Sequence, residues 1–325
     1  MTKKNPAKPE LLALSTRGNT IETLHYGWIC VLDKDKNVIY KKGNVNEQIL
    51  LRSCAKPIQA IPLVKHNIKI TGKELAIVCG SHSGSKKHLK VLYGFMKTYG
   101  LYLSDLQCGI HLPYDEKEKN NLIINNLHAN PLHNNCSGKH LGMLVVCKKN
   151  NWDLKNYLDL KHPLQKLILK TIEGLSETKK ISIGIDGCSL PTFGLPVINI
   201  AKMFSNFSSD KQYSRIISSM KKNPFYMGSE NQIDTEITKK SNGELIAKVG
   251  AEGIIVVFND GNSAVVKIAD GSPKARSIVV LKLLLKLGWL KQKEIKHSPL
   301  EEIIKGEIKN HRGICTGKII SLISS

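Results

Sequence analysis

Residues 53–66 read Ser-Cys-Ala-Lys-Pro-Ile-Gln-Ala-Ile-Pro-Leu-Val-Lys-His, and the sequence-based interpretation of the chain starts from this stretch. Its apolar residues predict a buried helix. Pro57 places the start of that helix close to Ser53, because proline is tolerated only in a first turn. Ser53 and Lys56 then share one helix face. A serine hydroxyl is a good nucleophile only when a neighbour takes its proton. The stretch therefore predicts Ser53 as nucleophile and Lys56 as base, with Arg52 and burial lowering the pKa of the lysine.

The Ser-x-x-Lys spacing alone is weak evidence. It recurs in this lysine-rich chain at Ser83/Lys86, Ser176/Lys179, Ser208/Lys211, Ser218/Lys221 and Ser219/Lys222. The Ser53 copy differs because it opens an apolar stretch that must be interior. The alternative, non-catalytic interpretation of any copy is a helix cap followed by a solvated lysine.

Composition excludes several classes of protein. The 325 residues carry a net charge of +21, with 41% apolar and 6% aromatic residues. The excess charge comes almost entirely from scattered lysines, whereas base recognition favours arginine and stacking needs aromatics, so nucleic-acid binding is not expected. No apolar run reaches the roughly 18 residues of a membrane helix. The N-terminus MTKKNPAKPE lacks the apolar region of a signal peptide, and the eight cysteines form no CxxC pair. A cytoplasmic location is expected.

The order of predicted elements indicates an α/β (α+β) architecture. Strands are predicted at 26–40 as a hairpin, and at 181–185, 246–258 and 264–268; helices are predicted at 86–99, 140–148, 162–175, 211–222 and 273–287. Residues 75–79 fit a short strand or helix that leads into the turn GSHSGS. Strands at both ends with helices between them predict a sheet packed with helices. The lysine-rich tail 291–325 gives no clear pattern.

Two further segments carry polar groups suited to catalysis. The turn around Ser81 can present hydroxyls and backbone N–H groups to an oxyanion or a carboxylate, or it can be an ordinary turn. Lys248 lies on a strand next to Gly250 and Gly253, so its side chain can point into a site that the backbone approaches closely. The alternative is a solvated lysine on an edge strand.

Cysteines from two loops suggest a metal site. Cys136 and Cys188 lie in the segments NNCSGKH and DGC, with Lys139 and His140 beside the first. Two thiolates with one of these nitrogen donors can hold zinc, and a lysine ligand must lose its proton to do so. The alternatives are a cysteine nucleophile paired with His140, or two buried structural thiols.

Taken together, these segments resemble the L-asparaginase II family of the Rhizobium etli type, also called class 3 asparaginases. The matching segments are RSCAKP (52–57), CGSHS (79–83), NNCSGKHLGML (134–144), GIDGCSLP (184–191) and KVGAEG (248–253), with TRGNTIETLHYG (16–27) as the opening. They follow the family's order across nearly the whole chain. Cys54, Ser189 and Leu190 depart from the family's usual residues, and the C-terminal tail matches least.

The resemblance implies one domain over residues 1–325 with two intimate lobes, and a fold like that of serine β-lactamases and glutaminases, a sheet flanked by helices with a helical lobe. It implies hydrolysis of L-asparagine to L-aspartate and ammonia by a homodimer. The resemblance assigns two Ser–Lys pairs to catalysis, Ser53–Lys56 and Ser81–Lys248. It assigns three zinc ligands, Cys136, Lys139 and Cys188, with water in the fourth position. It also assigns three residues that line the site, Arg52, His140 and Asp186.

Rival functions remain at this point. S-x-x-K also occurs in glutaminases and in other serine acyl-transfer hydrolases of the β-lactamase-like fold, although the Ser-Asp-Asn and Lys-Thr-Gly signatures of β-lactamases are absent. A binding protein that senses amino acids is a third hypothesis, which the intact motifs oppose. The sequence also leaves open whether the serine of Ser53–Lys56 or that of Ser81–Lys248 is the nucleophile.

Overall fold

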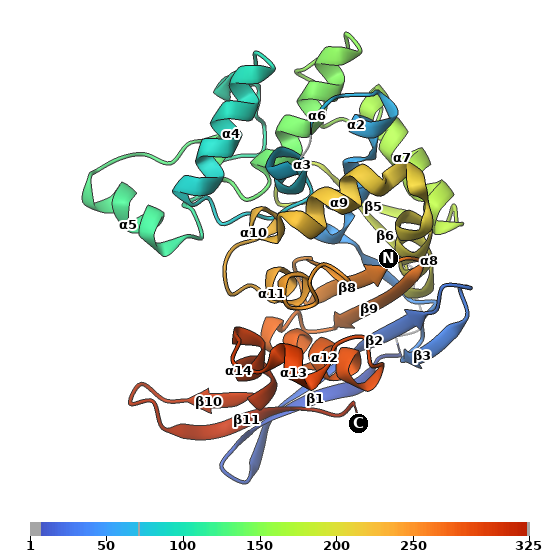
Figure 1. The fold of residues 1–325 in the computed structure, drawn as a ribbon, viewed down its shortest axis with the longest axis vertical. Helices are drawn as coiled ribbons and strands as arrows, with labels where there is room; N and C mark the ends of the chain where they lie inside the picture. The colour runs from blue at the N-terminus through green and yellow to red at the C-terminus, as the bar shows by residue number, and fades with distance from the viewer. Residues whose placement is uncertain (1–7, 71, 324–325) are drawn as a thin grey trace, which may run out of the picture.

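The computed structural model describes residues 8–70 and 72–323, and its centre is an antiparallel sheet in the order β10-β11-β1-β2-β9-β8-β7, with β3 paired to β2 (Figure 1). The strands of this sheet are β1 (Glu10–Arg17), β2 (Thr20–Leu32), β3 (Val38–Lys42), β7 (Ile246–Val249), β8 (Ile254–Asn259), β9 (Asn262–Ile268), β10 (Glu307–Lys309) and β11 (Cys315–Ser321). A smaller sheet, in the order β4-β6-β5, consists of β4 (Gln48–Leu50), β5 (Ser182–Ile185) and β6 (Pro191–Pro196). The N-terminal segment MTKKNPAKPE, for which we expect no signal peptide, lies mostly outside the described residues.

Helices form a lobe beside the sheet and also cover its faces, as Figure 1 shows. The lobe contains α2 (Ile61–Lys65), α3 (Gly72–Val78), α4 (Lys86–Thr98), α5 (Glu116–Ile124), α6 (Ser137–Lys149), α7 (Pro163–Ser176), α9 (Ser214–Lys222) and α10 (Pro224–Met227). The remaining helices are α1 (Lys56–Gln59), α8 (Val197–Ser209), α11 (Ile233–Lys240), α12 (Pro273–Lys286), α13 (Gln292–Ile295) and α14 (Pro299–Lys305). The expected sheet flanked by helices, with a helical lobe, is confirmed.

The middle of the sheet is buried on both faces. Along β8, Val256 and Phe258 belong to the core shared with α8 and the helical lobe, whereas Ile255 and Val257 belong to the core under α12. This follows from the two-residue repeat of a strand, in which successive side chains point to opposite faces. Strands that are buried on both faces consist of continuous apolar residues. The sequence of 246–258 therefore predicted a single strand.

Two predicted elements differ in the structure, and a third, left open as a strand or a helix, is a helix. The predicted helix from Ser53 is a 3-10 turn (Arg52–Ala55) followed by the short helices α1 and α2, because prolines interrupt the ladder of backbone hydrogen bonds. Residues 75–79 fall mostly in helix α3 rather than in a strand, and 246–258 is divided into β7 and β8 by the turn 250–253. The unassigned tail contains α13, α14, β10 and β11, and β11 pairs with β1.

Close packing of α3 against α6 positions two site segments, since Ser81 follows the first helix and Cys136 precedes the second. Gly138 makes this approach possible: a Cβ at this position would lie 2.6 Å from the backbone oxygen of Ile77. A Cβ at Gly94, in the middle of α4, would have no neighbouring atom within 4 Å.

We therefore expect opposite effects from two glycine-to-alanine changes within helices. Gly138→Ala should lower the free energy of unfolding by about 1–3 kcal/mol because the clash involves backbone that cannot move aside. Gly94→Ala should leave it unchanged or raise it by up to about 1 kcal/mol, because alanine is the better helix former. Urea unfolding of both variants measures this, and equal changes in both would contradict the packing argument.

Candidate active site

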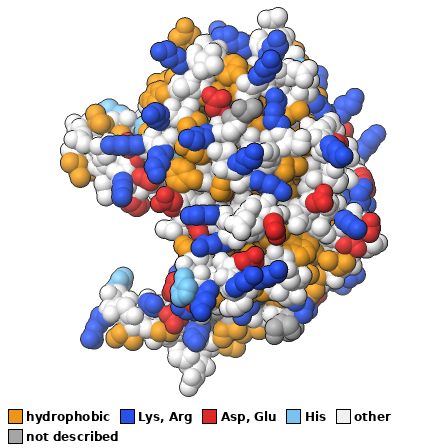
Figure 2. Space-filling model, viewed as in Figure 1, with side chains coloured by type: hydrophobic (Ala, Val, Ile, Leu, Met, Phe, Trp, Pro, Cys, Tyr) orange, Lys and Arg blue, Asp and Glu red, His pale blue; other side chains and the backbone are white. Residues whose placement is uncertain are grey.

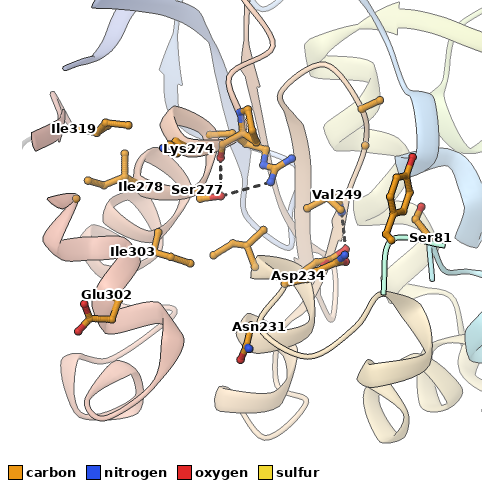
Figure 3. A pocket seen from close by; sticks show the side chains of 18 of the residues that line it. Ser81, Asn231, Asp234, Val249, Lys274, Ser277, Ile278, Glu302, Ile303 and Ile319 are labelled. Carbon is orange, nitrogen blue, oxygen red and sulfur yellow. Dashed lines mark hydrogen bonds between the residues drawn. The ribbon is translucent and has the colours of Figure 1, made fainter. Parts of the chain in front are cut away.

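Ser53 and Ser81 line one cavity of about 540 Å³. Ser53 comes from the 3-10 turn before α1, and Ser81 comes from the loop after α3. Figure 3 shows Ser81 at one end of this cavity, with Asp234 and Val249 next along the wall. The two serines predicted from separate motifs are thus brought to the same surface.

Lys56 is fully buried, and its amine contacts Ser81. Its Nζ donates to the carbonyl oxygen of Gly80 at 2.6 Å and to that of Asn135 at 3.2 Å, and lies 2.9 Å from Ser81 Oγ. The part of the chain that the structure describes shows no hydrogen bond between Lys56 and Ser53. The predicted partner of Lys56 is therefore replaced by the serine of the second motif.

Burial, together with the neighbouring amines of Lys139 and Lys248, lowers the pKa of Lys56 to about 8, against the opposing effect of the cysteines nearby. Arg52, which the sequence suggested as the neighbouring cation, is not among these causes; its guanidinium pairs with Asp186 instead. A lysine with such a pKa is neutral often enough at ordinary pH to accept a proton.

Ser81 is held by backbone as well as by amines. Its N–H donates to the carbonyl oxygen of Met227 at 2.7 Å, so this amide is already engaged and does not offer a free donor to an oxyanion. Gly80 permits this approach, because a Cβ there would lie 2.7 Å from Met227 Cα. The loop is therefore locked onto α10 and presents the Ser81 hydroxyl rather than its amide.

Lys248 is the second amine on Ser81. It lies on the edge strand β7 yet is fully buried, so the alternative of a solvated lysine on an edge strand is wrong. Its Nζ lies 3.3 Å from Ser81 Oγ and donates to the carbonyl oxygen of Val249 at 2.7 Å. One hydroxyl thus has two lysines beside it.

Asp234, at the start of α11, is a site residue that the motifs did not reveal. Its carboxylate is fully buried, lies 3.5 Å from Lys248 Nζ, and accepts the backbone N–H of Val249 at 3.0 Å and that of Thr235 at 3.0 Å. A buried charge requires a partner, and these contacts supply one. The only signal in the sequence was an acidic residue in the first turn of a helix, which many helix starts share.

Cys54 connects the two Ser–Lys segments. Its thiol donates to the carbonyl oxygen of Lys248 at 3.1 Å, and both residues are buried. Gly250 lies against the same turn: a Cβ there would be 3.0 Å from the Leu51 oxygen and 3.2 Å from Cys54 Sγ. Cys54 therefore has a structural use, since it fixes β7 onto the 3-10 turn.

Cys136, Lys139 and Cys188 meet beside Lys56. Lys139 Nζ donates to Cys188 Sγ at 3.1 Å. A hydrogen bond from Cys188 holds the pKa of Cys136 well below its usual value, while this pairing and burial raise the pKa of Cys188. The electrostatic attraction of both thiol groups raises the pKa of Lys139 despite its burial. Together these groups form a compact cluster of two sulfur donors and one nitrogen donor.

The chemistry of this donor set fits zinc, which prefers sulfur and nitrogen ligands. Within residues 8–70 and 72–323, no three His, Cys, Asp or Glu side chains cluster as a metal site would require, so a zinc site here depends on Lys139 as the third ligand. Bound zinc would require the Lys139 amine to give up its proton.

The three residues expected to line the site lie near it but not on the cavity wall. Arg52 Nε donates to Asp186 Oδ1 at 2.9 Å, and Arg52 has a left-handed backbone with φ of 47°. Strain of this kind persists only where surrounding contacts impose it, and it is frequent at functional sites. His140 is buried, with Nδ1 2.6 Å from the Tyr157 hydroxyl, so it supports α6 instead of facing the cavity.

The family model described as L-asparaginase II matches residues 13–321. The chain belongs to the L-asparaginase II family. No curated protein matches it closely. The resemblance seen in the sequence is therefore confirmed, and the protein is an amidohydrolase of the L-asparaginase type. No helix among the described residues is long and apolar enough to cross a membrane.

We expect Asp234 to act on catalysis through Lys248. Asp234→Asn should lower kcat by roughly 10²-fold with a smaller change in KM, because Lys248 loses the carboxylate that orients it. Glu236→Gln is the matched control: Glu236 is a buried carboxylate on the same helix, and its change should leave kcat intact. In a Lys248→Met background, Asp234→Asn should add little. Additive losses in the double variant would contradict the coupling.

Proposed function

We propose that the protein hydrolyses the side-chain amide of L-asparagine to L-aspartate and ammonia by a Ser–Lys mechanism. The observation that carries this proposal is the Ser81 hydroxyl, which lies on a cavity wall within 2.9 Å of one buried lysine amine and 3.3 Å of another. Family membership supplies the class of reaction, and this contact supplies a nucleophile with a base.

In this proposal Lys56 takes the proton of Ser81 as its oxygen attacks the amide carbon. Lys56 then returns a proton to the departing ammonia, and water hydrolyses the resulting aspartyl ester by the same route in reverse. Lys248, beside the carboxylate of Asp234, remains a cation next to the reacting oxygen and stabilises the negative charge that develops there. The two lysines thus have different roles, as base and as fixed charge.

Ser53 is the alternative nucleophile that the sequence suggested first. One observation favours it: Ser53 lines the same cavity as Ser81. In this scheme Ser81 would relay the proton of Ser53 to Lys56. In either case Ser81 and Lys56 are required, and the two schemes differ in which oxygen carries the aspartyl group.

Serine variants separate these schemes. Ser81→Ala should lower ammonia release from asparagine by at least about 10³-fold, since the hydroxyl in contact with the base is lost. Ser53→Ala should retain measurable turnover if Ser81 attacks. Ser83→Ala, from the same loop but off the cavity wall, is the control. Mass spectrometry of acid-quenched enzyme locates the ester. An ester on Ser53 would transfer the role of nucleophile to that residue, and full activity of Ser81→Ala would refute both schemes.

We further propose that Cys136, Lys139 and Cys188 bind zinc, which would hold the segment before α6 and the loop after β5 together around the substrate. The support is the 3.1 Å contact between Lys139 and Cys188 next to the lowered pKa of Cys136. We favour this ordering role because the carboxylate nearest to the cluster, that of Asp186, is already engaged by the guanidinium of Arg52 and is therefore a poor base for a bound water.

Elemental analysis tests the metal site. Cys136→Ser and Cys188→Ser should each reduce bound zinc to well below one equivalent, because one of the two thiolate ligands is lost. Cys147→Ser is the matched control, since Cys147 is a buried free thiol on the same helix α6. Equal zinc content in all three variants would place the metal elsewhere. A wild-type protein that is purified without zinc and binds none on titration would refute the zinc site.

Several expectations from the sequence and from the resemblance stay predictions. They are the homodimer, the cytoplasmic location, the single domain, the contribution of Arg52, His140 and Asp186 to substrate binding, and the choice of asparagine over glutamine. Glutamine assayed beside asparagine in the same ammonia assay addresses the last of these. Figure 2 shows Lys and Arg side chains spread over one face of the molecule with acidic residues among them. The expectation of no nucleic-acid partner stays a prediction.

A further inference from the structure

The cavity that contains the serines continues well beyond them. Figure 3 shows Ser81 at one end, Asp234 and Val249 next to it, and Ile278, Ile303 and Ile319 at the other end. These isoleucines come from α12, α14 and β11, all of which follow the last catalytic motif in the chain. The cavity is therefore a continuous site with a reactive end and an apolar end.

The size of the cavity exceeds what a free amino acid needs. About 540 Å³ lies within the range of pockets that hold drug-sized ligands. An asparagine placed with its amide at Ser81 would leave the apolar end filled with water. A cavity wall of isoleucine gains nothing from water, whereas it gains from contact with an apolar group.

Arg276 lines the cavity from α12 and lacks a full set of partners. Its Nε is buried and has no hydrogen-bond acceptor among the described residues, and its Nη2 reaches only the Ser277 hydroxyl, at 3.5 Å. A buried guanidinium donor without an acceptor is costly. Arginine is also the side chain best suited to hold a carboxylate through paired hydrogen bonds. Arg276 thus provides a place for a carboxylate of the substrate.

Two acidic residues lie at the apolar end. Glu302 of α14 and Glu307 of β10 line the cavity near Ile303 and Ile308. Each carboxylate also pairs with a lysine of its own element, Glu302 with Lys305 at 2.8 Å and Glu307 with Lys309 at 3.1 Å, so an amino group of a ligand would share these carboxylates with the lysines. The cavity therefore offers, in addition to the reactive serines, a cation for a carboxylate, an apolar wall and carboxylates for an amine.

We propose that this cavity binds a dipeptide whose C-terminal residue is asparagine and whose first residue is apolar, so that the enzyme also deamidates such peptides. The proposal rests on the proposed function, since the amide must reach Ser81. The α-carboxylate of the asparagine binds Arg276, so it cannot be part of a peptide bond. The α-nitrogen is then the one position at which the substrate can carry another residue. The preceding side chain then packs on the isoleucines, with its amino group toward Glu302 and Glu307.

The reaction is the same hydrolysis as with asparagine. The C–N bond of the side-chain amide breaks, ammonia leaves with a proton from water, and the hydroxyl of that water completes the new carboxyl group. The peptide bond stays intact. Leucyl-asparagine therefore yields leucyl-aspartate and ammonia, which mass spectrometry distinguishes from cleavage to leucine and asparagine.

The experiment compares ammonia release from asparagine, from leucyl-asparagine and from the reversed dipeptide asparaginyl-leucine. The reversed dipeptide has the same composition, but its asparagine carboxyl group is blocked. We expect kcat/KM for leucyl-asparagine to exceed that for the reversed dipeptide by at least tenfold. No preference between the dipeptides, or hydrolysis of asparagine without hydrolysis of leucyl-asparagine, would overturn the inference and leave the proposed function standing. Failure with all three substrates would refute the proposed function itself.

Two variants of α14 test the apolar end directly. Ile303→Gln should lower kcat/KM for leucyl-asparagine by about 10-fold or more and leave that for asparagine unchanged, because the lost contact involves only the leucyl group. Ile304→Gln is the matched control, since Ile304 is the next residue of the same helix, is similarly half-buried, and does not line the cavity. Equal effects of the two variants, or equal effects on both substrates, would contradict the placement of the leucyl side chain.

Discussion

The burial of the Lys56 amine is the constraint on which the site depends. An amine removed from water must find acceptors within the protein, and Lys56 finds them in two backbone carbonyl oxygens and the Ser81 hydroxyl. These acceptors belong to the loop after α3 and the segment before α6, so burying one side chain brings together three parts of the chain. The 3-10 turn that begins α1 fixes the direction of Lys56, and Cys54 fixes that turn onto β7.

Three buried lysines surround this point, and their partners give them different chemistry. Lys248 has the carboxylate of Asp234, and Lys139 has the two cysteines. Lys56 has carbonyl and hydroxyl oxygens but no carboxylate among the described residues, so its charge is the least compensated. Like charges nearby disfavour the charged form. The lysine whose pKa is lowered to about 8 is thus the one that lies 2.9 Å from the Ser81 hydroxyl.

The sequence predicted the members of the site better than their pairing. Ser53 and Lys56 were matched by local spacing, but the 3-10 turn directs the lysine toward Ser81, a contact that no local pattern contains. Asp234 went unnoticed for the same reason, since its partner Lys248 lies on another element and single acidic residues at helix starts are common. The burial of the central strands on both faces, by contrast, follows from their continuous apolar runs, and the hairpin at 26–40 was predictable.

The tail shows why an element without a motif can still matter. Its lysines hid the strands β10 and β11, and the pairing of β11 with β1 depends on residues about 300 positions apart, as in Ala13 with Ser321. This pairing places Ile319 and, through α14, Ile303 at the far end of the cavity. The motifs recognised in the sequence therefore supply the reacting groups, whereas the tail shapes the part of the cavity that a longer substrate would contact. Selectivity can then change through the tail without any change at Ser81 or Lys56.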